Sequence, residues 1–310
     1  MDFVHIDGLR INYGKFQAVI NLSLNIPKGE VFGFIGPNGA GKTSTIRALA
    51  TLLKPSAGLI FINGIDVLTS PSKIRGIIGY MPDSFGTYDD ITVNEYLHFF
   101  AAAYMIDREK REGTIRDVLE LTDLSAKQHD LVNALSRGMK QRLGLARILL
   151  HDPEFLLLDE PASGLDPRAR IEMRELLKEL KKMGKTILIS SHILPELSEL
   201  CTRIGIIEQG KLVAEGSIKE IYNKLGIMRK IQIQIMNLDD TMIEKIKNIA
   251  GVNEIITDID RITLKINENI LAIENLSGII HGFGAKVRMF HPEAMDMESA
   301  FMRLTEGKVS

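Results

Sequence analysis

The stretch Gly36-Pro37-Asn38-Gly39-Ala40-Gly41-Lys42-Thr43 decides the fold of this chain. It matches the pattern G-x-x-x-x-G-K-[ST], follows the apolar run 31–35 and precedes a helical pattern over residues 43–53. Its glycines let successive backbone N–H groups curl around phosphates, while Lys42 supplies a cation and the Thr43 hydroxyl can hold Mg²⁺. The stretch, extended by Ser44, therefore predicts a binding site for ATP or GTP.

Length and composition indicate an ordinary protein of two domains. The chain has 310 residues, of which 45% are hydrophobic and 25% are charged, and its net charge is −2. Because charges of both signs are interspersed, we expect neither nucleic acid nor an anionic lipid surface as a partner of the whole chain. The single cysteine, Cys201, excludes an internal disulfide or a cysteine-based metal site and is expected to be a small buried residue.

Nothing in the sequence predicts insertion into a membrane. Residues 1–5 lack the basic and apolar blocks of a signal peptide, and no apolar run approaches the roughly 18 residues of a spanning helix. We therefore expect a protein that reaches a membrane only through a partner.

Hydrophobic patterns place the phosphate loop in an α/β core. Extended patterns separated by turns over residues 9–62 predict a β-rich subdomain, and apolar residues at three- and four-residue spacing predict a helical insert over about 84–150. The apolar runs 155–158 and 186–189 flank a helical pattern over 168–182. Such an arrangement is typical of a βαβ unit in a parallel sheet that is buried on both faces.

After Tyr222 the pattern changes to that of a second, smaller domain, residues 223–310. We predict the element order β-α-β-β-α-β, as in a ferredoxin-like unit, and then a terminal helix over about 292–304. The six predicted elements are residues 231–235, 240–250, 252–258, 261–266, 270–282 and 285–290. No phosphate loop or catalytic pairing occurs there, so we expect a role in regulation, dimer contact or docking, with a ligand site as the alternative.

A pair of carboxylates predicts that the bound nucleotide is hydrolysed. Asp159 and Glu160 follow the buried run 155–158, at the carboxyl end of a strand, where ligands of open α/β sheets bind. Asp159 is expected to hold Mg²⁺ directly or through water. Glu160 points to a different face and is expected to polarise the attacking water, which is the role of a base in phosphoryl transfer.

Further motifs occur in a fixed order around these carboxylates. The segment Leu135-Ser136-Arg137-Gly138-Met139-Lys140-Gln141-Arg142 precedes them, and Ser163-Gly164-Leu165-Asp166 and Ser190-Ser191-His192 follow. Together with the phosphate loop, they resemble the ATP-binding subunits of ABC transporters over about residues 3–220. The resemblance implies an α/β P-loop ATPase core with an antiparallel β subdomain and a helical subdomain, followed here by the small α+β domain.

The resemblance also implies roles for residues outside the two main motifs. Tyr13 matches the position of an aromatic residue that stacks on adenine, and His192 matches a histidine that reaches the γ-phosphate. Asp83 stands where the family has a glutamine that touches metal-bound water, and its oxygens can still accept hydrogen bonds from that water or bind Mg²⁺. Asp166, with Ser163, is expected at the seam between two subunits.

The segment 135–139 corresponds to the family's L-S-G-G-Q, where a helix end meets the γ-phosphate held by the other subunit. Ser136 and Gly138 match this pattern, whereas Arg137 and Met139 depart from it. A helix N-terminus capped by serine still favours an anion, and the charge of Arg137 does not oppose phosphate. Because each phosphate loop lacks the helix end that completes it, the resemblance implies a head-to-tail dimer of two such subunits with two ATP molecules.

The partners implied by the resemblance are membrane proteins. The family docks its permease subunits on the helical insert, which implies two copies of a separate permease and a position at the cytoplasmic face of the membrane. The segment 80–83 and the short C-terminal module resemble subunits that serve ABC-2-type permeases, so we expect export rather than import. A soluble ATPase that clamps a ribosome or DNA is the alternative, whereas the segment 135–142 argues against a kinase or GTPase.

Overall fold

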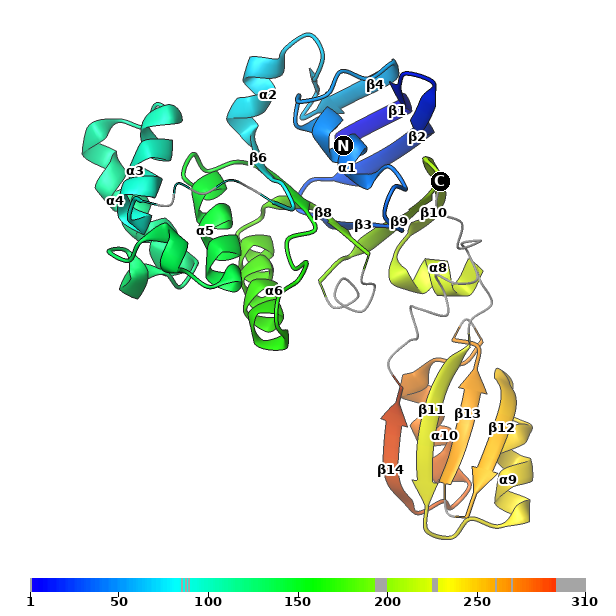
Figure 1. The fold of residues 1–310 in the computed structure, drawn as a ribbon. Coiled ribbons are helices and arrows are strands. Elements are labelled where there is room, and N and C mark those ends of the chain that lie inside the picture. Colours follow the sequence, from blue (N-terminus) through cyan, green and yellow to red (C-terminus); the bar gives the residue numbers. More distant parts are fainter. Residues whose placement is uncertain are drawn as a thin grey trace. The chain divides into compact units, whose positions relative to one another are not determined.

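The computed structural model describes residues 2–84, 86, 88, 90–192, 200–224, 228–259, 261–268 and 270–293, and for 222–224 the backbone alone. The chain divides into two compact units, of which the second begins at Ile218 (Figure 1). Each unit has a hydrophobic core of its own. The nucleotide motifs all belong to the first unit.

The first unit opens with an antiparallel sheet in the strand order β2-β1-β4-β5. Its strands are β1 (Asp2–Tyr13), β2 (Phe16–Pro27), β4 (Ala57–Ile62) and β5 (Ile65–Asp66). Asn63 and Gly64 between β4 and β5 both adopt positive φ, which is the reason for an Asn-Gly pair in a two-residue hairpin. The sheet confirms the predicted antiparallel β subdomain.

A six-stranded sheet in the order β10-β9-β3-β8-β7-β6 carries the phosphate loop. Five of its strands are parallel, and β10 lies antiparallel at one edge. The strands are β3 (Val31–Ile35), β6 (Ile78–Met81), β7 (Phe155–Asp159), β8 (Thr186–Ser191), β9 (Arg203–Glu208) and β10 (Lys211–Gly216). Every residue of β3, β7 and β8 is buried, so both faces of the sheet are covered, as predicted.

Three helices connect these strands: α1 (Lys42–Leu49) after β3, α2 (Pro71–Ile77) before β6, and α6 (Pro167–Lys182) between β7 and β8. The sequence pattern predicted that the first of them extends to residue 53. It ends earlier because Thr51 adopts a φ of 63°, which no right-handed helix allows. The predicted βαβ unit around α6 is confirmed.

The helical subdomain contains α3 (Val93–Ala103), α4 (Arg108–Leu121) and α5 (Arg137–Leu149), grouped at one end of the first unit (Figure 1). α3 begins where it does because Thr92 and Glu95 form a reciprocal capping box. Its buried residues Val93, Tyr96 and Leu97 recur at helical spacing. None of the helices in the described ranges combines the length and the apolar character needed to cross a bilayer.

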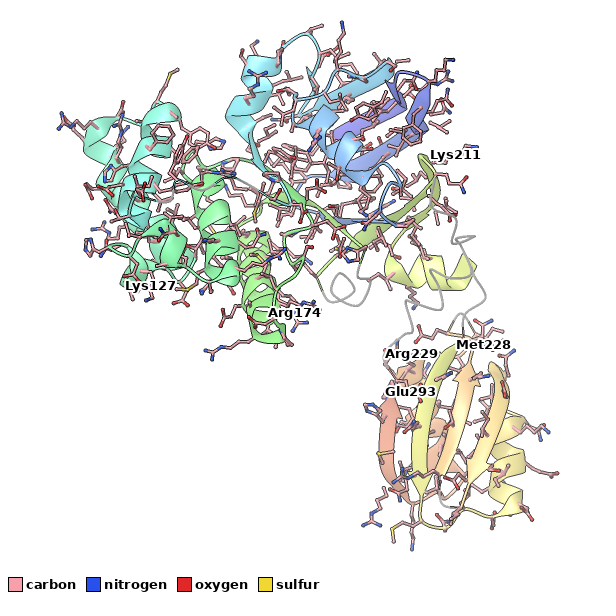
Figure 2. All side chains as sticks on the ribbon, in the orientation of Figure 1. Lys127, Arg174, Lys211, Met228, Arg229 and Glu293 are labelled. Atoms are coloured by element: carbon pink, nitrogen blue, oxygen red, sulfur yellow. The ribbon has the colours of Figure 1, made fainter. Side chains whose placement is uncertain are left out.

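The second unit contains α8 (Ile218–Lys224) and a four-stranded antiparallel sheet in the order β12-β13-β11-β14. Along the chain its sheet elements are β11 (Arg229–Ile235), α9 (Asp240–Lys247), β12 (Val252–Asp258), β13 (Arg261–Ile266), α10 (Ile273–Gly282) and β14 (Val287–Pro292). Isoleucines of β11 and β13 pack with residues of α9 and α10 in one core. Figure 2 shows Arg229 and Glu293 at the same end of this sheet, where β11 begins and β14 ends.

Several predicted boundaries in the second unit are wrong, including the starts of two strands: β11 begins at Arg229 rather than at 231, and β14 begins at Val287 rather than at 285. α9 ends at Lys247 rather than at 250, and α10 begins at Ile273 rather than at 270, because the N–H groups of Ile270 and Leu271 bond back to Asn267 in a turn. β14 runs to Pro292, where the terminal helix was predicted to begin. An edge strand tolerates this proline because its missing N–H is not needed there. The remainder of the predicted terminal helix lies outside the described residues.

Candidate functional site

The phosphate loop links β3 to α1 through backbone conformations that favour glycine. Gly39 has a φ of 82°, and Gly41, which caps the start of α1, has a φ of 106°. Residues with a Cβ rarely adopt such values. The free N–H groups of the first turn of α1 therefore open toward the loop, which creates a place for an anion.

Two glycines of the loop are required by close packing. A Cβ added at Gly36 would lie 2.3 Å from the Ile207 carbonyl oxygen, and one at Gly41 would lie 2.5 Å from that of Ala18. The loop is further tied down by the Gly210 N–H, which donates to the Ala40 carbonyl at 3.0 Å. Gly36 thus shapes the loop without lining the cavity described next.

A cavity of about 290 Å³ lies over the phosphate loop. It brings together most of the residues predicted to bind the nucleotide, and its lining consists of Tyr13, Phe16, Ala18, Pro37, Asn38, Gly39, Ala40, Gly41, Lys42, Thr43, Ser44, Asp83 and Glu160. Sequence analysis missed Phe16 and Ala18. Phe16 is about half exposed, like Tyr13, and the only signal in the sequence is a second aromatic residue three positions after Tyr13. The Tyr13 hydroxyl lies 3.3 Å from Ser44 Oγ, so these two residues share a hydrogen bond.

Lys42 is buried, and its ammonium group is fully engaged with the loop and with Glu160. Lys42 Nζ donates to the carbonyl oxygens of Gly36 at 2.6 Å and Pro37 at 3.2 Å. It also lies 3.3 Å from Glu160 Oε1. These partners compensate the cost of burying a charge and hold the cation at the floor of the cavity.

The two carboxylates at the end of β7 are organised by Ser190 of β8. Ser190 Oγ donates to Asp159 Oδ1 at 2.7 Å and accepts the Glu160 N–H at 3.0 Å. Glu160 itself adopts a φ of 50°, so its side chain leaves the strand in a different direction from that of Asp159. Sequence analysis quoted Ser190 only as part of the motif before His192 and missed this role, which depends on the pairing of Asp159 with Ser190 across the sheet.

Glu160 and His192 form a close pair. His192 Nδ1 lies 2.8 Å from Glu160 Oε2, and the histidine is 43% exposed where the glutamate is 13% exposed. The Glu160 carboxylate is therefore fixed between Lys42 on one oxygen and His192 on the other. A carboxylate held in this way at a phosphate cavity has the geometry to take a proton from water.

Asp83 lines the same cavity and lies in a negative field. Burial raises the pKa of its carboxyl, Asp159 and Glu160 raise it further, and Arg137 and His192 lower it. Its carbonyl oxygen accepts a hydrogen bond from Gln141 Nε2 of α5 at 3.3 Å. Asp83 thus connects the cavity with the helical subdomain.

The predicted metal ligands Thr43, Asp159 and Asp83 offer one hydroxyl and two carboxylates. Within the described residues, no three or more His, Cys, Asp or Glu side chains converge as a metal cage. Hard oxygen donors of this number suit Mg²⁺, which proteins hold through one or two carboxylates while substrate phosphates and water complete the shell. The residues therefore fit Mg²⁺ that arrives with a nucleotide.

Ser136, Gly138 and Asp166 do not line the cavity of their own chain. Ser136 is exposed and caps α5, where its Oγ accepts the Met139 N–H at 3.3 Å. Asp166 caps α6 by accepting the Ala169 N–H at 2.9 Å. A Cβ added at Gly138 would lie 2.8 Å from Ala169 Cβ, so glycine allows the two helix starts to approach closely.

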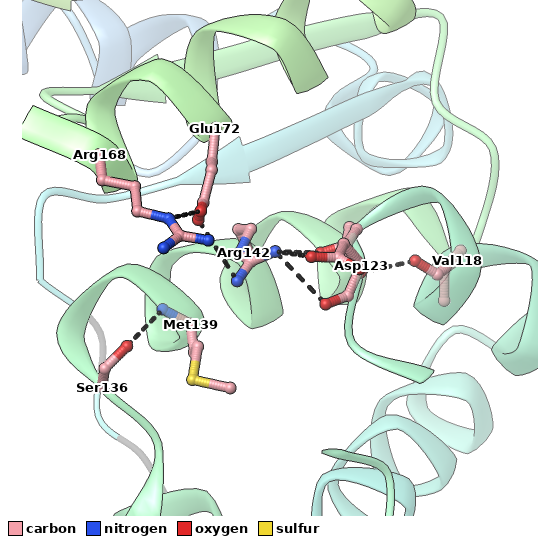
Figure 3. A network of polar contacts seen from close by, with 8 residues as sticks. Val118, Asp123, Ser136, Met139, Arg142, Arg168 and Glu172 are labelled. Carbon is pink, nitrogen blue, oxygen red and sulfur yellow. Dashed lines mark hydrogen bonds and ion pairs between the residues drawn. The ribbon is translucent and has the colours of Figure 1, made fainter. Parts of the chain in front are cut away.

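Arg142 ties the end of α4 and the middle of α5 to α6 (Figure 3). Its Nη1 donates to Asp123 Oδ2 at 2.8 Å, and its Nη2 lies 3.6 Å from Glu172 Oε2. Arg168 donates to the other oxygen of Glu172 at 3.0 Å. The helix that carries Ser136 is therefore anchored to both neighbouring helices.

The parallel sheet, the phosphate loop and the paired carboxylates define a P-loop nucleotide-binding ATPase. The ABC transporter family matches residues 19–163, and an AAA domain family matches residues 130–199. The chain is 33% identical over 249 residues, 80% of each protein, to the linearmycin resistance ATP-binding protein LnrL of Bacillus subtilis (strain 168). The chain belongs to the ABC transporter family, in which it is an ATP-binding subunit that hydrolyses ATP.

Two further similarities extend this result. The Nod factor export ATP-binding protein I of Paraburkholderia xenovorans (strain LB400) is 38% identical over 214 residues, 69% of this chain and 70% of that protein. A dimeric ATP-binding cassette solved in a post-hydrolysis state with ADP and phosphate superposes with a TM-score of 0.63 at 25% identity, over 69% of this chain and 98% of that one. The predicted family and ATPase activity are confirmed, and a soluble clamp is not favoured.

Proposed function

We propose that this subunit hydrolyses ATP in the cavity over its phosphate loop and thereby powers export through a separate permease. The proposal is carried by Glu160, whose carboxylate lies 2.8 Å from His192 and 3.3 Å from Lys42 at the wall of that cavity. Preorganised charges around one carboxylate allow proton transfer and charge stabilisation at the same place.

In this proposal, different residues of the chain carry out different parts of the reaction. The loop from Gly36 to Ser44 surrounds the phosphates, Tyr13 stacks on adenine, and Lys42 moves from its carbonyl partners to the terminal phosphates. Glu160 accepts a proton from water while the water oxygen forms a bond to the γ-phosphorus. The bond from that phosphorus to the β–γ bridging oxygen breaks, so that ADP and phosphate result.

Thr43, Asp159 and Asp83 are proposed to hold Mg²⁺, because Thr43 and Asp83 line the cavity and Asp159 ends β7 directly before Glu160, which lines it too. When bound, the ion supplies positive charge that offsets the charge on the leaving oxygen. Ser190 holds Asp159 in place for this role through its 2.7 Å hydrogen bond.

A head-to-tail dimer is proposed because the cavity lacks a helix end that the same chain carries elsewhere. Ser136 is exposed at the start of α5, and neither Ser136 nor Gly138 reaches the cavity of its own chain. A second subunit that presents this helix start, together with Asp166 and Ser163, would close the cavity over ATP. The solved relative with ADP and phosphate is itself dimeric, which supports the proposal.

The proposed partner of the helical subdomain is an ABC-2-type permease at the cytoplasmic face of a membrane. Tyr88 and Phe99 lie there with a ring separation of 5.5 Å in an edge-to-face arrangement, and each is 52% exposed. Exposed aromatic pairs of this kind are favourable anchors for another protein. Export is supported by the names of the similar proteins, which include linearmycin resistance and Nod factor export.

The second unit is proposed to be a ferredoxin-like accessory domain that begins between residues 218 and 223. The order β11-α9-β12-β13-α10-β14 and its antiparallel sheet support this assignment. Its proposed role is regulation, dimer contact or docking, and no nucleic acid is expected as a partner.

The experiment that tests the function is an isolation from native membranes. Tagged Glu160→Gln protein is purified in mild detergent with ATP, in parallel with Lys42→Ala as the variant with weakened ATP binding. A multi-spanning protein recovered at near-equal stoichiometry with Glu160→Gln supports a transporter subunit. Recovery of ribosomes or DNA without a membrane protein would refute it.

A further inference from the structure

The first turn of α5 touches three parts of the first unit at once. Gly138 packs against Ala169 of α6, because a Cβ added at Gly138 would lie only 2.8 Å from Ala169 Cβ. Gln141, on the same helix face as Arg137 because the two are four residues apart, donates to the Asp83 carbonyl. The third contact, made by Arg137, is with the loop that follows Glu160.

Arg137 lies directly on Gly164. A Cβ added at Gly164 would be 2.5 Å from Arg137 Cζ and 2.6 Å from each of its two Nη atoms. The guanidinium group therefore occupies the space that any other residue at 164 would need. Glycine at this position also satisfies a φ of 65°.

The loop beneath Arg137 is a short, hydrogen-bonded connection to Glu160. The Ser163 N–H donates to the Glu160 carbonyl at 3.0 Å, and the next residue is Gly164. This hydrogen bond closes a turn over residues 160–163, so only one peptide unit separates Gly164 from a segment that is tied to Glu160. Arg137 thus contacts a segment whose first residue is Glu160, the carboxylate between Lys42 and His192.

The other end of the connection is also rigid. α5 is anchored to α6 through Arg142 and Glu172 (Figure 3). It is also tied to Asp83 through Gln141. Asp83 in turn lines the cavity. The start of α5 is therefore linked to the cavity wall through Gln141 and Asp83.

We infer that Arg137 is a positioning residue that couples the two nucleotide sites of the dimer. In each subunit, Arg137 connects the start of α5, which completes the partner's site, to the loop after Glu160, which belongs to the subunit's own site. The start of α5 and this loop therefore move together. The inference rests on the proposed dimer, and it names the side chain that transmits a change at one nucleotide site to the other.

A double-mutant cycle on the contact tests this inference in the full-length chain. The variants are Arg137→Ala, Gly164→Ala and the combination of both, with Lys140→Ala as a control that removes a neighbouring positive charge on the same helix. ATPase rate against ATP concentration gives kcat, KM and the Hill coefficient. Equilibrium binding of ATP and the melting temperature report whether each variant is folded and able to bind nucleotide.

We expect Arg137→Ala and Gly164→Ala each to lower kcat about tenfold and to bring the Hill coefficient to about 1, with ATP binding little changed. The melting temperature should stay near that of wild type for Arg137→Ala and fall for Gly164→Ala, because alanine is strained at a φ of 65°. The double variant should be no worse than Gly164→Ala alone, because the added methyl group displaces the Arg137 guanidinium only when that side chain is present. Arg137→Lys, which keeps the charge and loses the planar group, should recover only part of the rate.

Multiplicative losses in the double variant, or a wild-type Hill coefficient in Arg137→Ala, would overturn the inference. The proposed function is tested separately, since it requires that wild type hydrolyse ATP and that Glu160→Gln form an ATP-dependent dimer. Wild-type turnover together with an unaffected Arg137→Ala would therefore refute the coupling and leave the function intact.

Discussion

Glu160→Gln should abolish ATP hydrolysis while strengthening ATP binding. Glutamine keeps the size of the side chain, and its amide still donates and accepts hydrogen bonds, but it cannot take a proton from water. Loss of a positioned general base lowers turnover by about 10²–10⁴-fold. Because product formation stops, the ATP-bound dimer should accumulate.

The effect on binding follows from the contact between Lys42 and Glu160. At 3.3 Å their Coulomb attraction is about 5 kcal/mol if the effective dielectric constant is about 20. ATP competes for the same ammonium group and is repelled by the same carboxylate. Most of this energy is offset by the solvation of the separated charges, so we expect a net gain of about 1 kcal/mol, or roughly fivefold tighter ATP binding.

The assay combines phosphate release at saturating ATP with equilibrium binding of ATP and size-exclusion chromatography in its presence. The matched control is Glu154→Gln, which removes the same charge from an exposed ion pair with Lys28. Its turnover should equal that of wild type. Hydrolysis by Glu160→Gln within about tenfold of wild type, or weaker ATP binding, would refute the assigned roles of Glu160 and Lys42.

Three other outcomes are expected. Lys42→Ala should weaken ATP binding by about 100-fold or more, as equilibrium dialysis would show; unchanged affinity contradicts the phosphate loop assignment. Ser190→Ala should lower kcat about tenfold at constant ATP affinity, whereas Ser190→Thr should keep activity; equal rates would contradict the hydroxyl bridge. Burial raises the pKa of Cys201 above its usual 9.0, so the folded state keeps the proton longer and stability falls as pH rises past about 9. Urea unfolding at pH 7 and pH 10 measures this, and Cys201→Ala should lose less stability.

The phosphate loop and the order of the elements could be predicted because they depend on local pattern. Gly36 to Thr43 follow a wholly buried strand and open a helix, as their spacing requires. β12 and β13 begin and end at the predicted residues, since each is bounded by turns. Such signals are contained within about ten consecutive residues.

Contacts between distant segments could not be predicted in this way. The bridge from Ser190 to both carboxylates depends on the register of β7 and β8, and Arg137 meets Gly164 only once α5 and α6 are packed. The need for glycine at position 36 likewise comes from Ile207, which is far away in the chain. These residues can be found in the sequence, but no pattern near them indicates which distant residues they contact.

The left-handed backbone of Glu160 lowers the stability of the native state at a residue that ATP hydrolysis requires. With a φ of 50°, this residue costs the native state about 1 kcal/mol relative to a right-handed conformation. Asparagine adopts this conformation more readily and would lower that cost, but its side chain is shorter and has no carboxylate. A laboratory selection for thermostability alone would therefore favour variants that no longer hydrolyse ATP. Only a selection that also requires ATP turnover would keep the glutamate.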